Sequence, residues 1–287
     1  MHTSSFFMEN NLFKKLKQTP LPERQAWAQS LLDEFSAYTE YKNGAKNPYL
    51  RWLDERIDKL RSHQQQLEQA HDRDHRYHGA CAEYGISSKH VVDFMNFWYP
   101  VSRHQPQILL RCAAALSDRE EQRWIVLGNY LEEIGFNKEE YDAHYTLLEQ
   151  LMKKMWGGLH IPKQAEAMVS RYHRKIDKKA TSHARATGML AAIEHPALDI
   201  SGYFHKMIEL AGRTHLLKKD PYLLIHVDVE PSHIILSHES AKSHMKKGHE
   251  QEVIEAFHET MGFWVEFWPK AFKTVGYQEN SLEQCIT

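Results

Sequence analysis

Two histidines and one glutamate lie close together in the segment HVDVEPSH. They are His226, Glu230 and His233, spaced four and three residues apart. This spacing brings the side chains onto one surface, where two imidazoles and a carboxylate could form half of an iron site. The chain holds 20 His and 38 Asp and Glu, so chance alone gives roughly 0.2 matches to this pattern.

The segment is predicted to cross the start of a helix. Glu230 precedes Pro231, and proline is favoured at the first helical position because its missing N–H is not needed there. We therefore expect Glu230 at the N-cap of a helix over about 231–246. His226 would then lie on the segment that enters the helix.

Other candidate ligands occur earlier in the chain. In NYLEEIGFNKEEYDAH, Glu133 ends one predicted helix and His144 lies in the first turns of the next, so both could converge on one metal ion from either side of the turn. Glu194 follows the small-residue stretch ATGMLAAI, where a buried carboxylate is costly unless it is paired or bound to metal. The alternative for each carboxylate is an ordinary charge in water at a helix end.

Composition excludes several functional classes. The chain has 287 residues, 42% of them hydrophobic, and a net charge of −2, which predicts a folded core and no general attraction to nucleic acid or anionic membranes. Cys81, Cys112 and Cys285 are odd in number and lack CxxC spacing, so a disulfide framework is disfavoured and the reducing cytoplasm is expected. Neither an export signal nor a membrane span is indicated.

The fold class follows from periodicity. Glycine and proline are sparse and helical spacing recurs along the chain, which predicts an all-α protein. We expect an N-terminal helical extension over residues 1–75 and a main domain over residues 76–287 that opens with an aromatic-rich helix pair capped by Ser87. The other predicted helices span about 22–39, 47–72, 139–156, 162–178, 182–195, 199–213, 231–246 and 249–272.

Two rival metal sites use the same residue types. A surface site could form from four residues at helical spacing: Glu68, His71, His75 and His78. A ferritin-like bundle would use Glu-x-x-His pairs on separate core helices. Three such pairs occur: Glu68/His71, Glu230/His233 and Glu255/His258. The first lies in the predicted extension, and the last two are close in sequence, so this arrangement is disfavoured.

Taken in order, the candidate residues resemble the haem-oxygenase-like diiron oxidases and oxygenases, which share a helical bundle with haem oxygenase. In that family an aromatic stretch precedes Asn-Leu-x-x-Glu-x-Gly, and here NFWYPVSRHQPQILL precedes GNYLEEIG. A His then opens the next helix, a lone Glu lies on a small-residue helix, and the last motif is His, three residues, Asp, two residues, His. The resemblance covers about residues 78–272 and implies six ligands: Glu133, His144, Glu194, His226, Glu230 and His233.

Two departures from the family pattern leave alternatives open. Glu230 stands where the family usually has Asp, and Asp228 could take its place if the turn is wound differently. The interval from Glu133 to His144 is one residue longer than the common form, so Glu132 could replace Glu133.

The resemblance implies a haem-oxygenase-like helical bundle that binds two Fe(II) ions and uses O2 as co-substrate. The expected partner is a small molecule such as an amino acid, an amine or a fatty acid, and a homodimer stays open. Aromatic side chains could line an apolar pocket and an arginine could bind a substrate carboxylate. The candidates are Phe97, Trp98, Tyr99, Phe263, Trp264, Phe267, Arg103, Arg123 and Arg185. A cofactor-free or non-catalytic helical protein of the same fold would leave the six ligands as coincidence.

Overall fold

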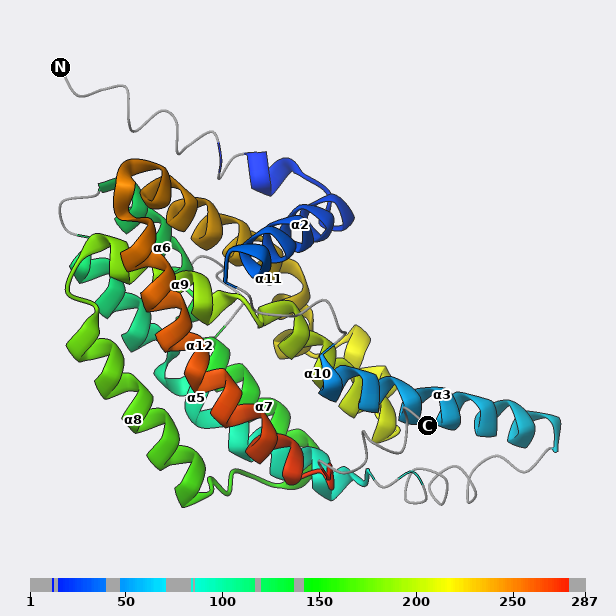
Figure 1. Ribbon diagram of the computed structural model, residues 1–287. Coiled ribbons are helices and arrows are strands. Elements are labelled where there is room, and N and C mark those ends of the chain that lie inside the picture. Colours follow the sequence, from blue (N-terminus) through cyan, green and yellow to red (C-terminus); the bar gives the residue numbers. More distant parts are fainter. Residues whose placement is uncertain are drawn as a thin grey trace.

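The computed structural model describes residues 12, 15–39, 47–70, 84, 86–116, 120–136 and 142–278. Every regular element within these ranges is a helix, which confirms the all-α prediction (Figure 1). The helices are α2 (Leu21–Thr39), α3 (Pro48–Gln69), α5 (Ser88–Ala115), α6 (Glu120–Glu133), α7 (His144–Trp156), α8 (Lys163–Lys179), α9 (His183–Glu194), α10 (Ala197–Leu210), η1 (Thr214–Lys218), α11 (Pro221–His244), η2 (Met245–His249) and α12 (Glu250–Lys273).

Helix α9 lies in the core, against α5, α11 and α12. Its small residues allow this close packing: a Cβ atom added to Gly188 would lie 2.3 Å from the carbonyl oxygen of Val253 in α12. The indole N–H of Trp264 donates to the carbonyl of Ala192 at 3.0 Å, which also ties α12 to α9. The carboxylate at the end of α9, Glu194, is therefore carried into the core.

Helix α5 is the long aromatic helix that the sequence predicts. Ser87 caps it, as expected, by accepting a hydrogen bond from the backbone N–H of His90. Trp98 stacks on Trp264 of α12 with ring centroids 6.1 Å apart, and both side chains are buried. This contact joins α5 to α12, the last helix of the bundle.

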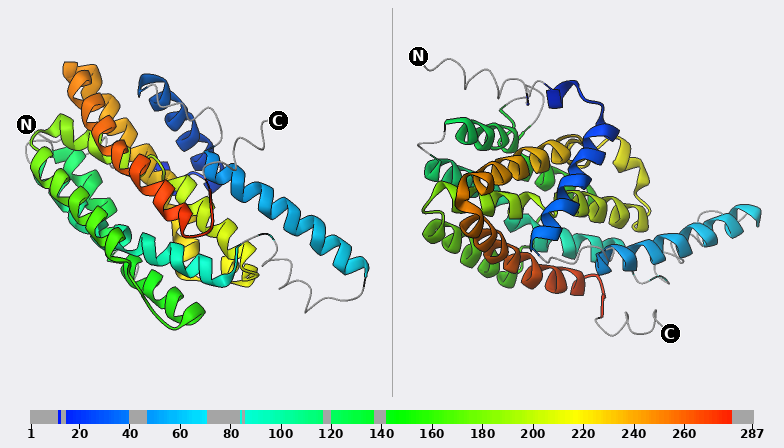
Figure 2. Two further views of the ribbon diagram at one scale, coloured as in Figure 1. Left: turned by 60° about the horizontal axis from the view of Figure 1, so that its bottom comes forward. Right: turned by 45° about the horizontal axis from the view of Figure 1, so that its top comes forward.

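The N-terminal helices pack on the bundle in different ways. Helix α2 lies across α11, while α3 contacts α10 and projects from the body in all three ribbon views (Figures 1 and 2). Asn47 caps α3 by accepting from the N–H of Tyr49. The predicted boundary at residues 75 and 76 falls outside the described residues.

The predicted start of the helix that carries three candidate ligands is wrong. Helix α11 begins at Pro221, and Asp220 caps it by accepting from the N–H of Tyr222, so the Asp-Pro signal lies ten residues before the Glu-Pro pair. Pro231 is inside the helix, where its missing N–H leaves the carbonyl of Val227 without the usual helical donor. Packing against α2, α9 and α10 maintains the helix through this position.

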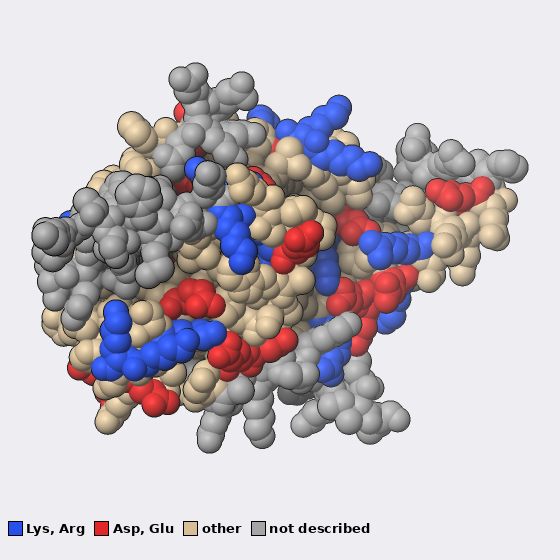
Figure 3. All heavy atoms as spheres, turned by 90° about the horizontal axis from the view of Figure 1, so that it is seen from above, with Lys and Arg blue, Asp and Glu red and all other residues tan. Residues whose placement is uncertain are grey.

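The surface carries mixed charge. On the face seen in Figure 3, Lys and Arg side chains are interspersed with Asp and Glu, as the net charge of −2 leads one to expect. Within the described ranges, no helix combines the length and apolar character needed to cross a membrane.

Candidate metal centre

The structure brings together all six residues that the sequence singles out as ligands; five of them are buried and His226 is partly buried. Four helices supply them: α6 ends at Glu133, α7 begins at His144, α9 ends at Glu194, and α11 carries the other three. Because α11 is continuous, His226, Glu230 and His233 lie on one face at successive turns. This arrangement is more regular than the predicted one, in which His226 preceded the helix.

One part of the cluster joins α6, α7 and α11. The Nδ1 atom of His144 lies 3.2 Å from Oε2 of Glu133. The rings of His144 and His226 have centroids 4.8 Å apart. Among the described residues, Nε2 of His144 has no hydrogen-bond partner although its side chain is completely buried. A buried imidazole nitrogen without a hydrogen bond, beside a carboxylate and a second imidazole, belongs to a donor set suited to a divalent cation.

The other part joins α9 and α11. Nδ1 of His233 lies 3.8 Å from Oε2 of Glu194 and 3.6 Å from Oε2 of Glu230. One ligand-type atom from each of these three residues lies within 4.8 Å of the others, close enough for one ion. Glu230 also faces the first part of the cluster, since its Oε1 atom is 4.0 Å from Nε2 of His226. Glu230 thus lies between the two groups of donors.

Hydrogen bonds fix the ring orientation of His226. Its Nδ1 atom lies 2.6 Å from the backbone carbonyl of Tyr222, which can only accept, so Nδ1 carries the proton. Nε2 is left with a lone pair directed toward Glu230. The phenol of Tyr222 in turn accepts from the indole N–H of Trp98 at 3.1 Å. Tyr222 was not among the predicted site residues, although its position four residues before His226 could have suggested the contact.

The two neighbouring glutamates of α6 have different positions. Glu133 faces His144, whereas Oε2 of Glu132 accepts from Nε2 of His233 at 2.8 Å. This bond leaves Nδ1 of His233 toward the cluster, an arrangement in which an outer carboxylate orients a metal-binding imidazole. Of the two alternatives, Glu133 therefore has the position of a ligand and Glu132 that of a supporting residue.

Asp228, the alternative to Glu230, lies away from the cluster. Its carboxylate pairs with Arg24 of α2 at 2.8 Å, and half of its side chain is exposed. Arg24 also donates to the backbone carbonyl of Asp228 and to the hydroxyl of Ser232. Arg24 therefore holds α11 on both sides of Pro231, and nothing in the sequence marked it.

Burial and neighbouring charges shift the pKa values of three residues in the cluster. Burial, reinforced by the Glu230 carboxylate, raises the pKa of Glu194 to about 8. Burial also acts to raise the pKa of Glu133, but the adjacent His144 imidazole has a larger, opposite effect. The pKa of Glu133 is therefore about 2. The pKa of His233 is well above its usual value because the carboxylates around it outweigh its burial. Divalent cations would relieve the repulsion between these carboxylates.

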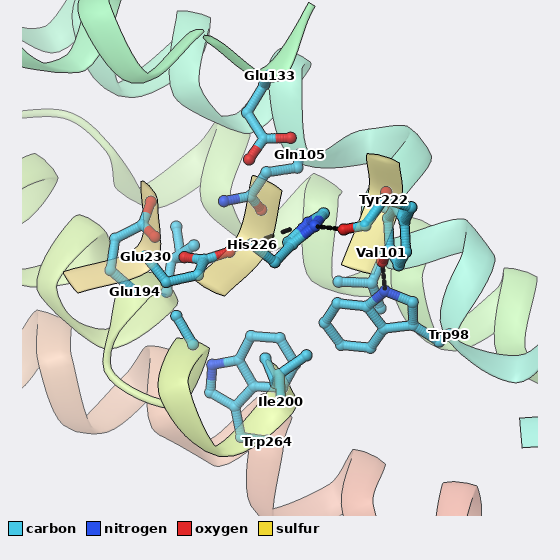
Figure 4. Close-up of a pocket in the computed structure, with 13 residues that line it drawn as sticks. Trp98, Val101, Gln105, Glu133, Glu194, Ile200, Tyr222, His226, Glu230 and Trp264 are labelled. Carbon is cyan, nitrogen blue, oxygen red and sulfur yellow. Dashed lines mark hydrogen bonds and ion pairs between the residues drawn. The ribbon is translucent and has the colours of Figure 1, made fainter. Parts of the chain in front are cut away.

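A small cavity of about 50 Å³ opens beside the cluster (Figure 4). Glu133, Glu194, Glu230 and His226 line it from α6, α9 and α11. The remaining wall is mostly apolar, with Ser102, Gln105 and Tyr222 as polar exceptions. Its apolar side chains are Trp98, Val101, Ile193, Ala197, Ile200 and Trp264.

Several predicted lining residues lie elsewhere. Of the six aromatic candidates, Trp98 and Trp264 line the cavity, while Phe97, Tyr99, Phe263 and Phe267 are buried and absent from its wall. The arginine candidates Arg103, Arg123 and Arg185 do not line it either. Arg103 is paired with Glu166 and Arg185 with Glu259.

The structure tests one of the two rival sites. Glu255 and His258 are exposed on α12, so this pair does not project into the core as a ferritin-like site requires. His71, His75 and His78 of the proposed surface site lie outside the described residues.

No protein-family model matches this chain, and no curated protein matches it.

Proposed function

We propose that this chain is a non-haem diiron oxidase or oxygenase with a haem-oxygenase-like fold, which uses O2 to oxidise a small organic molecule. The observation that carries the proposal is the position of Glu230 between two donor groups, Glu133/His144/His226 and Glu194/His233. Three carboxylates and three imidazoles suit two Fe(II) ions, since mixed oxygen and nitrogen donors bind this metal well.

When bound, the iron would supply O2 activation, and the surrounding residues would prepare the site for it. The Tyr222 carbonyl holds the proton of His226 on Nδ1, and Glu132 holds that of His233 on Nε2. Nε2 of His226 thus presents a lone pair to the cluster, and His233, whose pKa is well above its usual value, would release the proton on Nδ1 when a cation binds. Burial of Glu194 disfavours its negative charge until a cation is present, which couples its ionisation to metal binding.

The cavity supports a substrate with a small apolar portion. Trp98, Ile200 and Trp264 would exclude water from the reacting group, while Gln105 offers an amide for one polar contact. The fold itself does not select the reaction, so the residues of this wall would determine which substrate binds. A screen of amino acids, amines and fatty acids would identify it.

Anaerobic titration of the metal-free protein with Fe(II), followed by exposure to O2, tests the proposal. We expect about two irons per chain and a transient change in the visible spectrum. His226→Ala should abolish both, whereas His258→Ala, a change at an exposed histidine on α12, should preserve them. Absence of iron uptake would indicate a cofactor-free or binding protein. Loss of uptake on changing Glu255 and His258, with none on changing His226, would indicate the ferritin-like alternative.

A further inference from the structure

Three tryptophan side chains stack on one another beside the cavity. Trp264 and Trp268, both on α12, have ring centroids 5.6 Å apart, and Trp98 of α5 lies 6.1 Å from each of them. The angles between the ring planes are 5°, 16° and 18°, so the three indoles are nearly parallel. All three side chains are buried, and they form one continuous stack of aromatic faces.

One end of this stack faces the candidate metal centre. Trp98 and Trp264 line the cavity together with Glu194, as Figure 4 shows, whereas Trp268 is not part of the cavity wall. The indole N–H of Trp264 donates to the carbonyl of Ala192, two residues before Glu194. An oxidant formed in the cavity would therefore lie beside two indoles.

Aromatic contacts continue from the other end of the stack to the surface. Trp268 contacts Phe272 at a centroid distance of 6.1 Å. Phe272 in turn stacks on Tyr49 of α3 at 4.4 Å, with an angle of 21° between the rings. Phe272 is fully buried, whereas Tyr49 is partly exposed. A path of adjacent rings thus leads from the cavity wall to a phenol at the surface.

The chemistry of indole and phenol gives this path a direction. Both groups lose one electron more readily than other aromatic side chains do. An indole can lose an electron and keep its N–H proton, so transfer within the stack needs no proton acceptor. An oxidised phenol releases its proton, which requires water or a base. Tyr203 lies 5.1 Å from Trp268 but is fully buried, whereas Tyr49 is partly exposed and can release a proton to water. The path therefore ends at Tyr49.

We propose that Trp98, Trp264, Trp268 and Tyr49 form an electron relay between the cavity and the surface. One electron leaves the phenol of Tyr49, whose proton passes to water, and restores an oxidised indole of the stack to its neutral form. A soluble thiol then returns one electron and one proton to Tyr49, and two oxidised thiols combine as a disulfide. The relay rests on the proposed function for its oxidant, O2, and would protect the cavity wall from oxidation when no substrate is bound.

Laser photoionisation of tryptophan in the metal-free protein tests the path without iron. Transient absorption follows the tryptophan radical as it decays and the tyrosine radical as it grows, in a phase that does not depend on protein concentration. Tyr49→Phe should reduce the amplitude of this phase about twofold or more. Tyr203→Phe, at the buried phenol, and Tyr38→Phe, at an exposed tyrosine of α2 outside the path, should preserve it. An unchanged phase in Tyr49→Phe would overturn the relay.

Peptide mass spectrometry of the iron-loaded protein, after exposure to O2 with a soluble thiol and no substrate, tests the protective role. Trp268→Phe interrupts the path outside the cavity wall, so oxidation of Trp98 and Trp264 should rise several-fold. Tyr49→Phe should have the same effect, whereas Trp124→Phe, at an exposed indole on α6, should have none. Unchanged oxidation in both path variants would overturn this role. Absence of iron uptake in the unaltered chain would refute the proposed function instead, and the metal-free measurement would still decide whether the relay exists.

Discussion

Two buried histidines on α11 lie five residues apart and have opposite electrostatic surroundings. His233 is within 4 Å of carboxylate oxygens from Glu132, Glu194 and Glu230, and its pKa is well above the usual value. His238 instead accepts from an imidazole, that of His195 at 3.2 Å, and its pKa is well below the usual value, mainly because of burial. Burial of an imidazole therefore does not by itself indicate a metal site. The surrounding carboxylates distinguish the first region, around His233, from the second region, around His195 and His238.

The largest difference between the regions should appear in metal content. His233→Ala removes a donor from the cluster and should lower bound iron from about two ions per chain to one or none. His238→Ala removes an imidazole of equal burial and should leave the iron content unchanged. Iron analysis after anaerobic loading measures both. Similar iron loss in the two variants would mean that general destabilisation, and not ligation, controls iron uptake.

The imidazole pair of His195 and His238 should make the folded protein less stable in acid. Burial lowers the pKa of His195 to about 4 in the folded state, against about 6.5 when unfolded. Above pH 6.5 the group is neutral in both states, so it imposes no penalty. As the pH falls toward 4, the unfolded state binds the proton first and the folded state loses up to about 3 kcal/mol.

Urea unfolding of the metal-free protein between pH 7 and 4 measures this loss. His195→Gln should flatten the dependence, while His258→Gln, at an exposed position, should not. An unchanged slope in His195→Gln would assign the acid sensitivity to other groups, including those of the carboxylate cluster.

Within the first region, Glu132 and Glu133 should contribute unequally to iron affinity. Glu132→Ala removes the hydrogen bond that orients His233 and should weaken iron binding by about tenfold to a hundredfold. Glu133→Ala removes a carboxylate that faces His144 inside the cluster, so its effect on iron affinity should be larger. Competition with a chelator ranks the two, and the reverse order would exchange their assigned positions.

The smallest effects should come from the two contacts that tie α2 to these regions. Arg24→Met removes three hydrogen bonds beside the first region and should cost about 1 to 2 kcal/mol of unfolding free energy. Lys242→Met breaks a partly exposed pair with Glu34 beside the second region and should cost less than about 1 kcal/mol. Denaturant unfolding compares them, and equal losses would contradict a special role for Arg24 at the proline.

The sequence predicts the helices well where periodicity and capping agree. Ser87 marks the start of α5, and the candidate ligands lie at helix ends or on one helical face. The start of α11 was missed because Asp220-Pro221 and Glu230-Pro231 give the same local signal, and only packing along the whole helix distinguishes a start from an internal proline. Local propensity does not contain that information.

Long-range contacts account for the other errors. Asp228 and Glu230 both carry a carboxylate, so residue type does not distinguish them as ligands. Their side chains point to different sides of α11, that of Asp228 toward Arg24 of α2 and that of Glu230 toward the cluster. Arg24 is about two hundred residues away in the chain, so no local pattern predicts the contact. The same reason explains why Arg103, which pairs with Glu166, is not in the cavity wall.

The close contact of Gly188 with the backbone of Val253 has a consequence for how this chain can change in evolution. The contact fixes the axial position and rotation of α9 relative to α12. Glu194 and His195, at the end of α9, face different neighbours. One inserted residue turns a helix by about 100° and lengthens it by about 1.5 Å. An insertion or deletion between Gly188 and Glu194 would therefore turn the carboxylate away from the cluster, so variation in α9 should proceed by substitution at constant length.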